Sequence, residues 1–104
     1  MQSKRAKTAK GKPTVAQLKP VVLRITQEYG VRNVRIFGSF ARGEQKKRSD
    51  VDLLVRMPKG TTLFDLAGLK IDLEKALKRK VDVVQDHCIK PALRSNILKG
   101  AKVL

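Results

Sequence analysis

The sequence predicts an α/β fold in which helices pack against a small mixed β-sheet. Stretches with apolar residues at helical spacing alternate with short runs rich in β-branched residues. Capping residues, prolines and glycines separate these stretches. The length of 104 residues suits one small domain. Because helices and strands alternate, the strands are expected to form one sheet that the helices cover.

The first helix is expected over residues 15–29. Thr14 and Gln17 form a capping-box pattern, and Gly30 is a favourable residue just past a helix end. Pro20 either kinks this helix or starts it afresh. Apolar side chains at helical spacing form one stripe along it: Leu18, Val21, Val22, Ile25 and Tyr29.

Three strands are expected in the middle of the chain. Residues 31–39 alternate in character and run into a Gly-Ser turn, from which a short helix starts at "SFAR". Residues 51–57 form a second strand that Pro58 and Gly60 close. The stretch "KVDVVQ", residues 80–85, forms the third.

A second long helix follows the cap pair Thr62 and Asp65 and continues to about Lys78. Its expected buried stripe consists of Leu63, Leu66, Leu69, Leu73, Ala76 and Leu77. Pro91 and Gly100 bracket a short last helix, and residues 101–104 add an edge strand.

The chain is strongly basic, with 24 Lys and Arg against 9 Asp and Glu and a formal charge of +15. Such a surface attracts polyanions such as nucleotides or nucleic acid. Residues 1–13 are expected to form a basic flexible arm, which either binds RNA or serves as a solvated tail, and residues 14–104 form the folded domain.

The sequence contains no apolar run long enough for a membrane span and no signal peptide, so a soluble, cytoplasmic protein is expected. The single cysteine, Cys88, excludes an internal disulfide. With one histidine, His87, a zinc site built on thiolate and imidazole has too few ligands. A metal bound here must therefore use oxygen ligands.

Two aspartates one residue apart, Asp50 and Asp52, precede the apolar run 53–55. In a strand, residues two apart point to the same face, so these carboxylates are expected to project together. Like charges that close disfavour ionisation unless a cation lies between them, and an all-oxygen ligand set suits Mg²⁺. If the second and third strands are neighbours, Asp82 joins the pair. Three carboxylates can hold two Mg²⁺ ions for an in-line displacement on a nucleotide.

The Gly-Ser turn is expected to supply the other half of this chemistry. Gly38 lets the backbone come close to an anion, while the Ser39 hydroxyl and nearby amides can donate to phosphate oxygens. Arg42, on the short helix, either neutralises phosphate charge or pairs with a nearby carboxylate. The metals and the turn would then hold opposite ends of one triphosphate.

The Gly-Ser turn and the aspartate pair, with the spacing between them, resemble the signature of a known family. Ten residues separate Ser39 from Asp50, and "GSFARGEQKKRSDVDLLV" resembles the signature of the DNA polymerase β-like nucleotidyltransferases. The "GSFARGE" and "SDVDLLV" portions look like the minimal nucleotidyltransferases, which are single-domain members of that superfamily. The resemblance covers nearly the whole chain apart from the basic arm.

The resemblance implies a nucleotidyltransferase fold and a set of roles. Gly38 and Ser39 match the family's phosphate-binding turn, Asp50 and Asp52 its metal-binding pair, and Asp82 its third carboxylate, a metal ligand and candidate general base. Family members transfer a nucleoside monophosphate from a triphosphate, usually ATP, to a hydroxyl. Minimal members commonly act as antitoxins of HEPN-domain ribonuclease toxins, in some cases by adding AMP to a toxin tyrosine. The implied partner is a HEPN toxin.

Two other functions compete with this hypothesis. In the first, the chain neutralises a toxin by contact alone. In the second, it binds RNA, and its charge is its function; the basic arm and the "QKKR" loop at residues 45–48 are not required by the family pattern.

Three residues after the third strand are expected to have minor roles. Cys88 is expected to be a small buried group, His87 a surface or rim residue, and Asp86 a loop acid.

Overall fold

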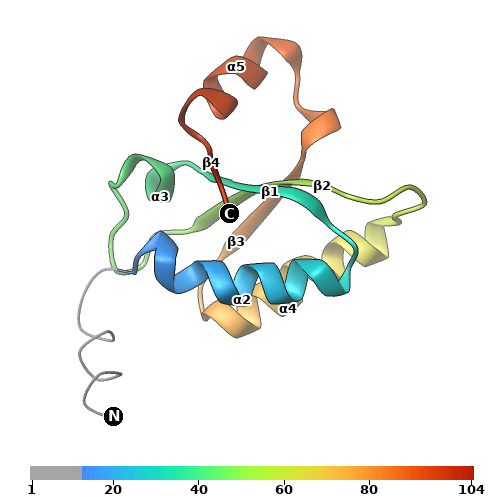
Figure 1. Ribbon diagram of the computed structural model, residues 1–104, viewed down its shortest axis with the longest axis horizontal. Coiled ribbons are helices and arrows are strands. Elements are labelled where there is room, and N and C mark those ends of the chain that lie inside the picture. The colour runs from blue at the N-terminus through green and yellow to red at the C-terminus, as the bar shows by residue number, and fades with distance from the viewer. Residues whose placement is uncertain (1–12) are drawn as a thin grey trace.

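The computed structural model describes residues 13–104, so the arm expected over residues 1–13 lies almost wholly outside the described residues. Helices and strands alternate along the chain, as predicted (Figure 1). The elements are α2 (Val15–Glu28), β1 (Arg32–Phe37), α3 (Ser39–Arg42), β2 (Val51–Arg56), α4 (Leu63–Leu77), β3 (Val81–Gln85), the 3-10 helix η1 (Asp86–Cys88), α5 (Pro91–Gly100) and β4 (Lys102–Val103).

The four strands form one mixed sheet in the order β3-β2-β1-β4. β1 runs antiparallel to β2 and to β4, whereas β2 and β3 are parallel neighbours. The register places Phe37 of β1 opposite Asp52 of β2, and Asp52 opposite Asp82 of β3. The two aspartates that the sequence placed on separate strands therefore lie side by side.

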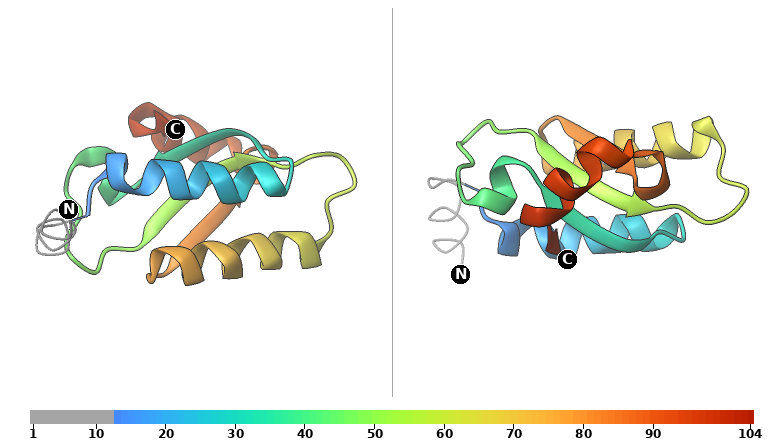
Figure 2. Two further views of the ribbon diagram at one scale, coloured as in Figure 1. Left: turned by 60° about the horizontal axis from the view of Figure 1, so that its bottom comes forward. Right: turned by 90° about the horizontal axis from the view of Figure 1, so that it is seen from above.

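Helices cover the two faces of the sheet unequally. α2 and α4 lie side by side on one face, while α5 lies alone on the other (Figures 1 and 2). Fully buried side chains from the strands and the two long helices fill the first layer; they include Val22, Ile36, Val51, Leu53, Val55, Leu69, Leu73 and Val81. α5 contributes no buried residue. The face that carries Asp52 is therefore the more open one.

Both long helices begin at the capping boxes that the sequence predicts. The Thr14 side chain accepts a hydrogen bond from the Gln17 amide, and Thr62 does the same for Asp65. These caps satisfy amides that have no partner within the helix. α2 runs through Pro20 as one helix, so the proline does not start it afresh.

The expected buried stripe of α4 is only partly correct. Leu69 and Leu73 are fully buried, but Leu63 is 82% exposed and the neighbouring Phe64 is 89% exposed. The contact between the two helices involves later turns of α4, where the Tyr29 hydroxyl donates to Asp72 at 2.5 Å. A helical stripe indicates which side of a helix is apolar, but not how far along it the neighbouring helix extends.

The residues after β3 differ from the expectations in two ways. Cys88 is exposed rather than buried, because η1 turns it away from the core. Asp86 is not a solvated loop acid: it is 4% exposed and forms ion pairs with two arginines. His87 is exposed, as predicted. Among residues 13–104, every helix is too short or too polar to cross a membrane.

Candidate active site

The Gly-Ser turn joins the end of β1 to α3. Gly38 has φ 73° and ψ −148°, a backbone conformation that residues other than glycine rarely adopt. A Cβ atom at this position would overlap the Oδ2 atom of Asp52 and lie 3.1 Å from its Cγ. Glycine is therefore required here both by the backbone conformation and by the close approach of the Asp52 carboxylate. The turn and the carboxylate form one continuous surface.

Asp52 lies at the centre of this surface, between β1 and β3. Its side chain is half-buried, and this burial is the main reason that the pKa of its carboxyl group is raised; the negative charges of Asp82 and Asp50 add to the effect, and Arg42 opposes it. The shift has the sign expected when carboxylates share a small, partly desolvated volume. Such a volume favours a bound cation.

The structure does not assemble all three aspartates into one tight cluster. Asp52 and Asp82 are paired across β2 and β3, whereas Asp50 precedes β2 and is exposed. Within residues 13–104, no three acidic, histidine or cysteine side chains are arranged closely enough to hold a metal ion. Asp50 is thus near enough to raise the pKa of Asp52 but stands apart from the pair. Asp50 directly precedes β2, which begins at Val51, so the expectation that Asp50 and Asp52 project together stays a prediction.

The residues present nevertheless fit a divalent cation. Asp52 and Asp82 supply hard carboxylate oxygens at neighbouring positions, and the raised pKa of Asp52 indicates that its charge lacks compensation. Mg²⁺ needs only one or two carboxylates when phosphate and water oxygens complete its coordination. A two-carboxylate pair with Asp50 at its rim therefore matches the donor set of a Mg²⁺–nucleotide site.

Arg42 pairs with a nearby carboxylate, which is the second of the two roles expected for it. Its Nε atom lies 2.8 Å from Oε1 of Glu44, and both side chains are more than half exposed. Exposed pairs of this kind contribute little to stability and exchange readily. Arg42 therefore remains available to an incoming phosphate, and its charge already opposes the raised pKa of Asp52.

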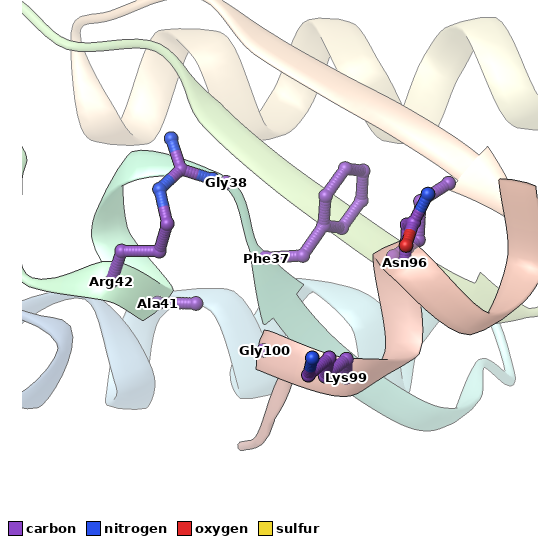
Figure 3. Close-up of a pocket in the computed structure, with 8 residues that line it drawn as sticks. Phe37, Gly38, Ala41, Arg42, Asn96, Lys99 and Gly100 are labelled. Carbon is purple, nitrogen blue, oxygen red and sulfur yellow. The ribbon is translucent and has the colours of Figure 1, made fainter.

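A pocket of about 440 Å³ opens next to the Gly-Ser turn, between α3 and α5. Figure 3 shows Phe37 at its centre, Ala41 and Arg42 on the α3 side, and Asn96 on the α5 side. The α5 residues were not predicted from the sequence. They lie more than fifty positions from the Gly-Ser turn, and no motif connects them to it.

α5 is held over the sheet by an ion-pair cluster. Asp86 accepts from Nη2 of Arg56 on β2 at 2.9 Å and contacts Nη1 of Arg94 on α5 at 2.6 Å. Arg94 also donates to the Asp86 carbonyl oxygen. The hydrogen bonds from Arg94 and Arg56 lower the pKa of the Asp86 carboxyl group, so that it stays charged despite its burial. This cluster positions the α5 wall of the pocket.

Comparison with known proteins identifies this arrangement. The family model for the nucleotidyltransferase domain matches residues 18–104. The chain belongs to the nucleotidyltransferase domain family. The match includes the Gly-Ser turn, the Asp-x-Asp pair and Asp82, and it confirms the resemblance seen in the sequence.

Two similar members of this family are named as protein adenylyltransferases. A Methanocaldococcus jannaschii protein named "putative protein adenylyltransferase" is 41% identical over 87 residues, which cover 84% of this chain and 94% of the relative. The protein adenylyltransferase MntA of Thermococcus cleftensis is 35% identical over 75 residues, which cover 72% of this chain and 76% of the relative.

A solved structure described as a "putative minimal nucleotidyltransferase" has a TM-score of 0.74 and 43% identity, over 86% of this chain and 90% of that one. It confirms the predicted nucleotidyltransferase fold. An MNT antitoxin from Shewanella oneidensis, in complex with its tri-AMPylated HEPN toxin, has the same fold, with a TM-score of 0.66 at 17% identity over 83% of this chain and 67% of that one.

Proposed function

We propose that this nucleotidyltransferase transfers AMP from ATP to a hydroxyl group of a partner protein, and that it acts as the antitoxin of a HEPN ribonuclease toxin. The observation that carries the proposal is the Asp52–Asp82 pair beside the Gly38 turn. The names of its relatives, protein adenylyltransferases, support the reaction. Complexes of structurally similar antitoxins with HEPN toxins support the partner.

The roles of the residues follow from their positions. The Gly38 and Ser39 turn, with Arg42, would bind the outer phosphates of ATP. Asp52 and Asp82, with Asp50 at the rim, would hold two Mg²⁺ ions. These ions would stabilise the charge that develops on the reacting phosphate and on the pyrophosphate leaving group.

The transfer is an in-line displacement at the α-phosphorus atom. The oxygen of the acceptor hydroxyl forms a bond to phosphorus as the bond to the pyrophosphate oxygen breaks. The proton of the attacking hydroxyl passes to a base, a role that the position of Asp82 on β3, next to Asp52, allows. The products are an AMP ester of the acceptor and pyrophosphate. The acceptor hydroxyl would come from the partner, as the AMPylated toxin in the complex of a structurally similar antitoxin supports.

The test is label transfer from α-labelled ATP to the proposed HEPN partner, for which the protein encoded by the neighbouring gene is the first candidate. Replacing Asp52 by Asn should reduce transfer by several orders of magnitude, because it removes a metal ligand while keeping the shape of the side chain. Asp72→Asn is the matched control. Asp72 lies on α4, on the other face of the sheet, and Asn can still accept the Tyr29 hydrogen bond. Undiminished transfer by Asp52→Asn would refute the assignment.

A further inference from the structure

The pocket between α3 and α5 differs in character from the carboxylate site beside it. The half-buried ring of Phe37 lies at its centre (Figure 3). Ala41 and Ile97 add apolar surface from the two helices, and Arg42 and Lys99 add one cation from each. A volume of about 440 Å³ lies within the range of small-molecule sites. The aromatic and apolar part of this lining suits a flat ring system, while Gly38 and Arg42 border the turn proposed to bind the phosphates.

The position of the pocket relates it to the donor nucleotide rather than to the acceptor. β2 lies between β3 and β1, so Asp82 and Phe37 flank Asp52 on opposite sides. A reacting phosphate held at Asp52 can place one substituent over Phe37 and leave the Asp82 side open to an attacking hydroxyl. The pocket is continuous with the Gly38 turn, which also lines it.

One uncharged amide lies at the α5 side of the pocket. Asn96 is exposed and takes part in none of the side-chain hydrogen bonds found among residues 13–104. A primary amide offers an acceptor oxygen and a donor NH₂ group, which match the N6 donor and the N7 acceptor on one edge of adenine. The same edge of guanine presents two acceptors and cannot satisfy both atoms of the amide.

We propose that this pocket binds the adenosine part of ATP, with the base against Phe37 and its edge read by Asn96. The inference rests on the proposed function and extends it, because it names the residues that select the nucleotide. The base lies between Phe37 and Ile97, and α5, held by Arg94 and Asp86, supplies the side of the pocket that recognises it.

Calorimetric titration of the full chain tests the proposal with three probes in Mg²⁺ buffer: ATP, GTP and inorganic tripolyphosphate. The unaltered chain should bind ATP more tightly than GTP. Asn96→Ala should weaken ATP binding about tenfold and remove most of its advantage over GTP, as expected from the loss of one two-point base contact. Its affinity for tripolyphosphate should not change, because Asn96 lies on the α5 side of the pocket and the phosphates bind on the opposite side, at the Gly38 turn and Arg42.

A pocket-filling variant gives an independent result. Ile97→Trp should weaken ATP binding by more than tenfold and leave tripolyphosphate binding unchanged. Leu93→Trp places the same bulk on α5 at a residue that is 52% exposed and does not line the pocket, and it should bind ATP normally. Circular dichroism checks that each variant is folded. If Ile97→Trp fails to fold, Asn96→Ala, at an exposed position, still tests the proposal.

The outcomes separate this inference from the proposed function. Normal ATP binding by both pocket variants would overturn the adenosine site and leave the proposed transfer intact. Equal losses for ATP and tripolyphosphate would also overturn it, because the pocket would then hold phosphates. Failure of the unaltered chain to bind ATP would overturn the proposed function together with the inference.

Discussion

Replacing Gly38 by Ala tests the close contact between the turn and Asp52. Two costs are expected. The backbone conformation of Gly38, φ 73° and ψ −148°, costs a residue with a side chain about 1–3 kcal/mol. The new methyl group also overlaps Asp52 Oδ2, which must rotate from its preferred position at about 0.5–1.5 kcal/mol. Together these predict a loss of about 3 kcal/mol in the free energy of unfolding.

Gly43→Ala is the matched control. Gly43 has φ 71° and ψ 18° at the end of α3, and an added Cβ there meets no atom within 4 Å. Its replacement should cost only about 1–2 kcal/mol, the usual penalty of a left-handed residue. Urea denaturation measures both values.

The share of this cost that belongs to Asp52 can be isolated. In an Asp52→Ala background the overlapping oxygen is absent, and the Cβ atom of residue 52 lies 3.4 Å from the new methyl group, an ordinary contact. Gly38→Ala should then cost about 1 kcal/mol less than in the unaltered chain, the energy of rotating the side chain. An identical cost in the two backgrounds would refute the reasoning that Asp52 packs directly against this turn.

Two titrations test other contacts. Asp86→Asn should destabilise the fold by about 2 kcal/mol at neutral pH, because it removes the charge that two arginines surround. Since the pKa of Asp86 is lowered on folding, its contribution should be full above the unfolded pKa, near 4, and fade as the pH falls below it; the variant should lack this acid dependence in urea denaturation. The hydrogen bond to Asp72 raises the pKa of Tyr29, the only tyrosine, to about 12, so Asp72→Ala should shift its absorbance titration towards the ordinary tyrosine pKa of 10.0; an unmoved midpoint would contradict the contact.

Local sequence signals predicted most of the fold. The capping residues at Thr14 and Thr62 marked the helix starts because they act on the backbone within three residues. The pairing of Asp52 with Asp82 depended on one assumption, that β2 and β3 are neighbours, and the parallel register bears it out. The candidate Gly-Ser turn and Asp-x-Asp pair were visible because they lie within one short stretch of chain.

The remaining features depend on contacts between distant segments. Asp86 is charged and follows a strand, which locally indicates a solvated loop; its burial results from Arg56 and Arg94, which reach it from β2 and α5. The pocket is formed where α5 crosses the open face of the sheet, and nothing in "PALRSNILKG" indicates which side chains face Phe37. A contact between two distant segments forms only in the folded state, so neither segment carries a periodic sequence pattern that indicates it.

Intact-mass analysis of the partner protein tests the central claim most directly. This chain, ATP and Mg²⁺ would be incubated with the candidate partner encoded by the neighbouring gene, and the intact masses of both proteins would be measured before and after. The account predicts a gain of one or more AMP units on the partner, lost when Asp52 is replaced by Asn. Tight binding of the two proteins with no gain in mass under any condition would contradict it and would indicate an antitoxin that acts by contact alone.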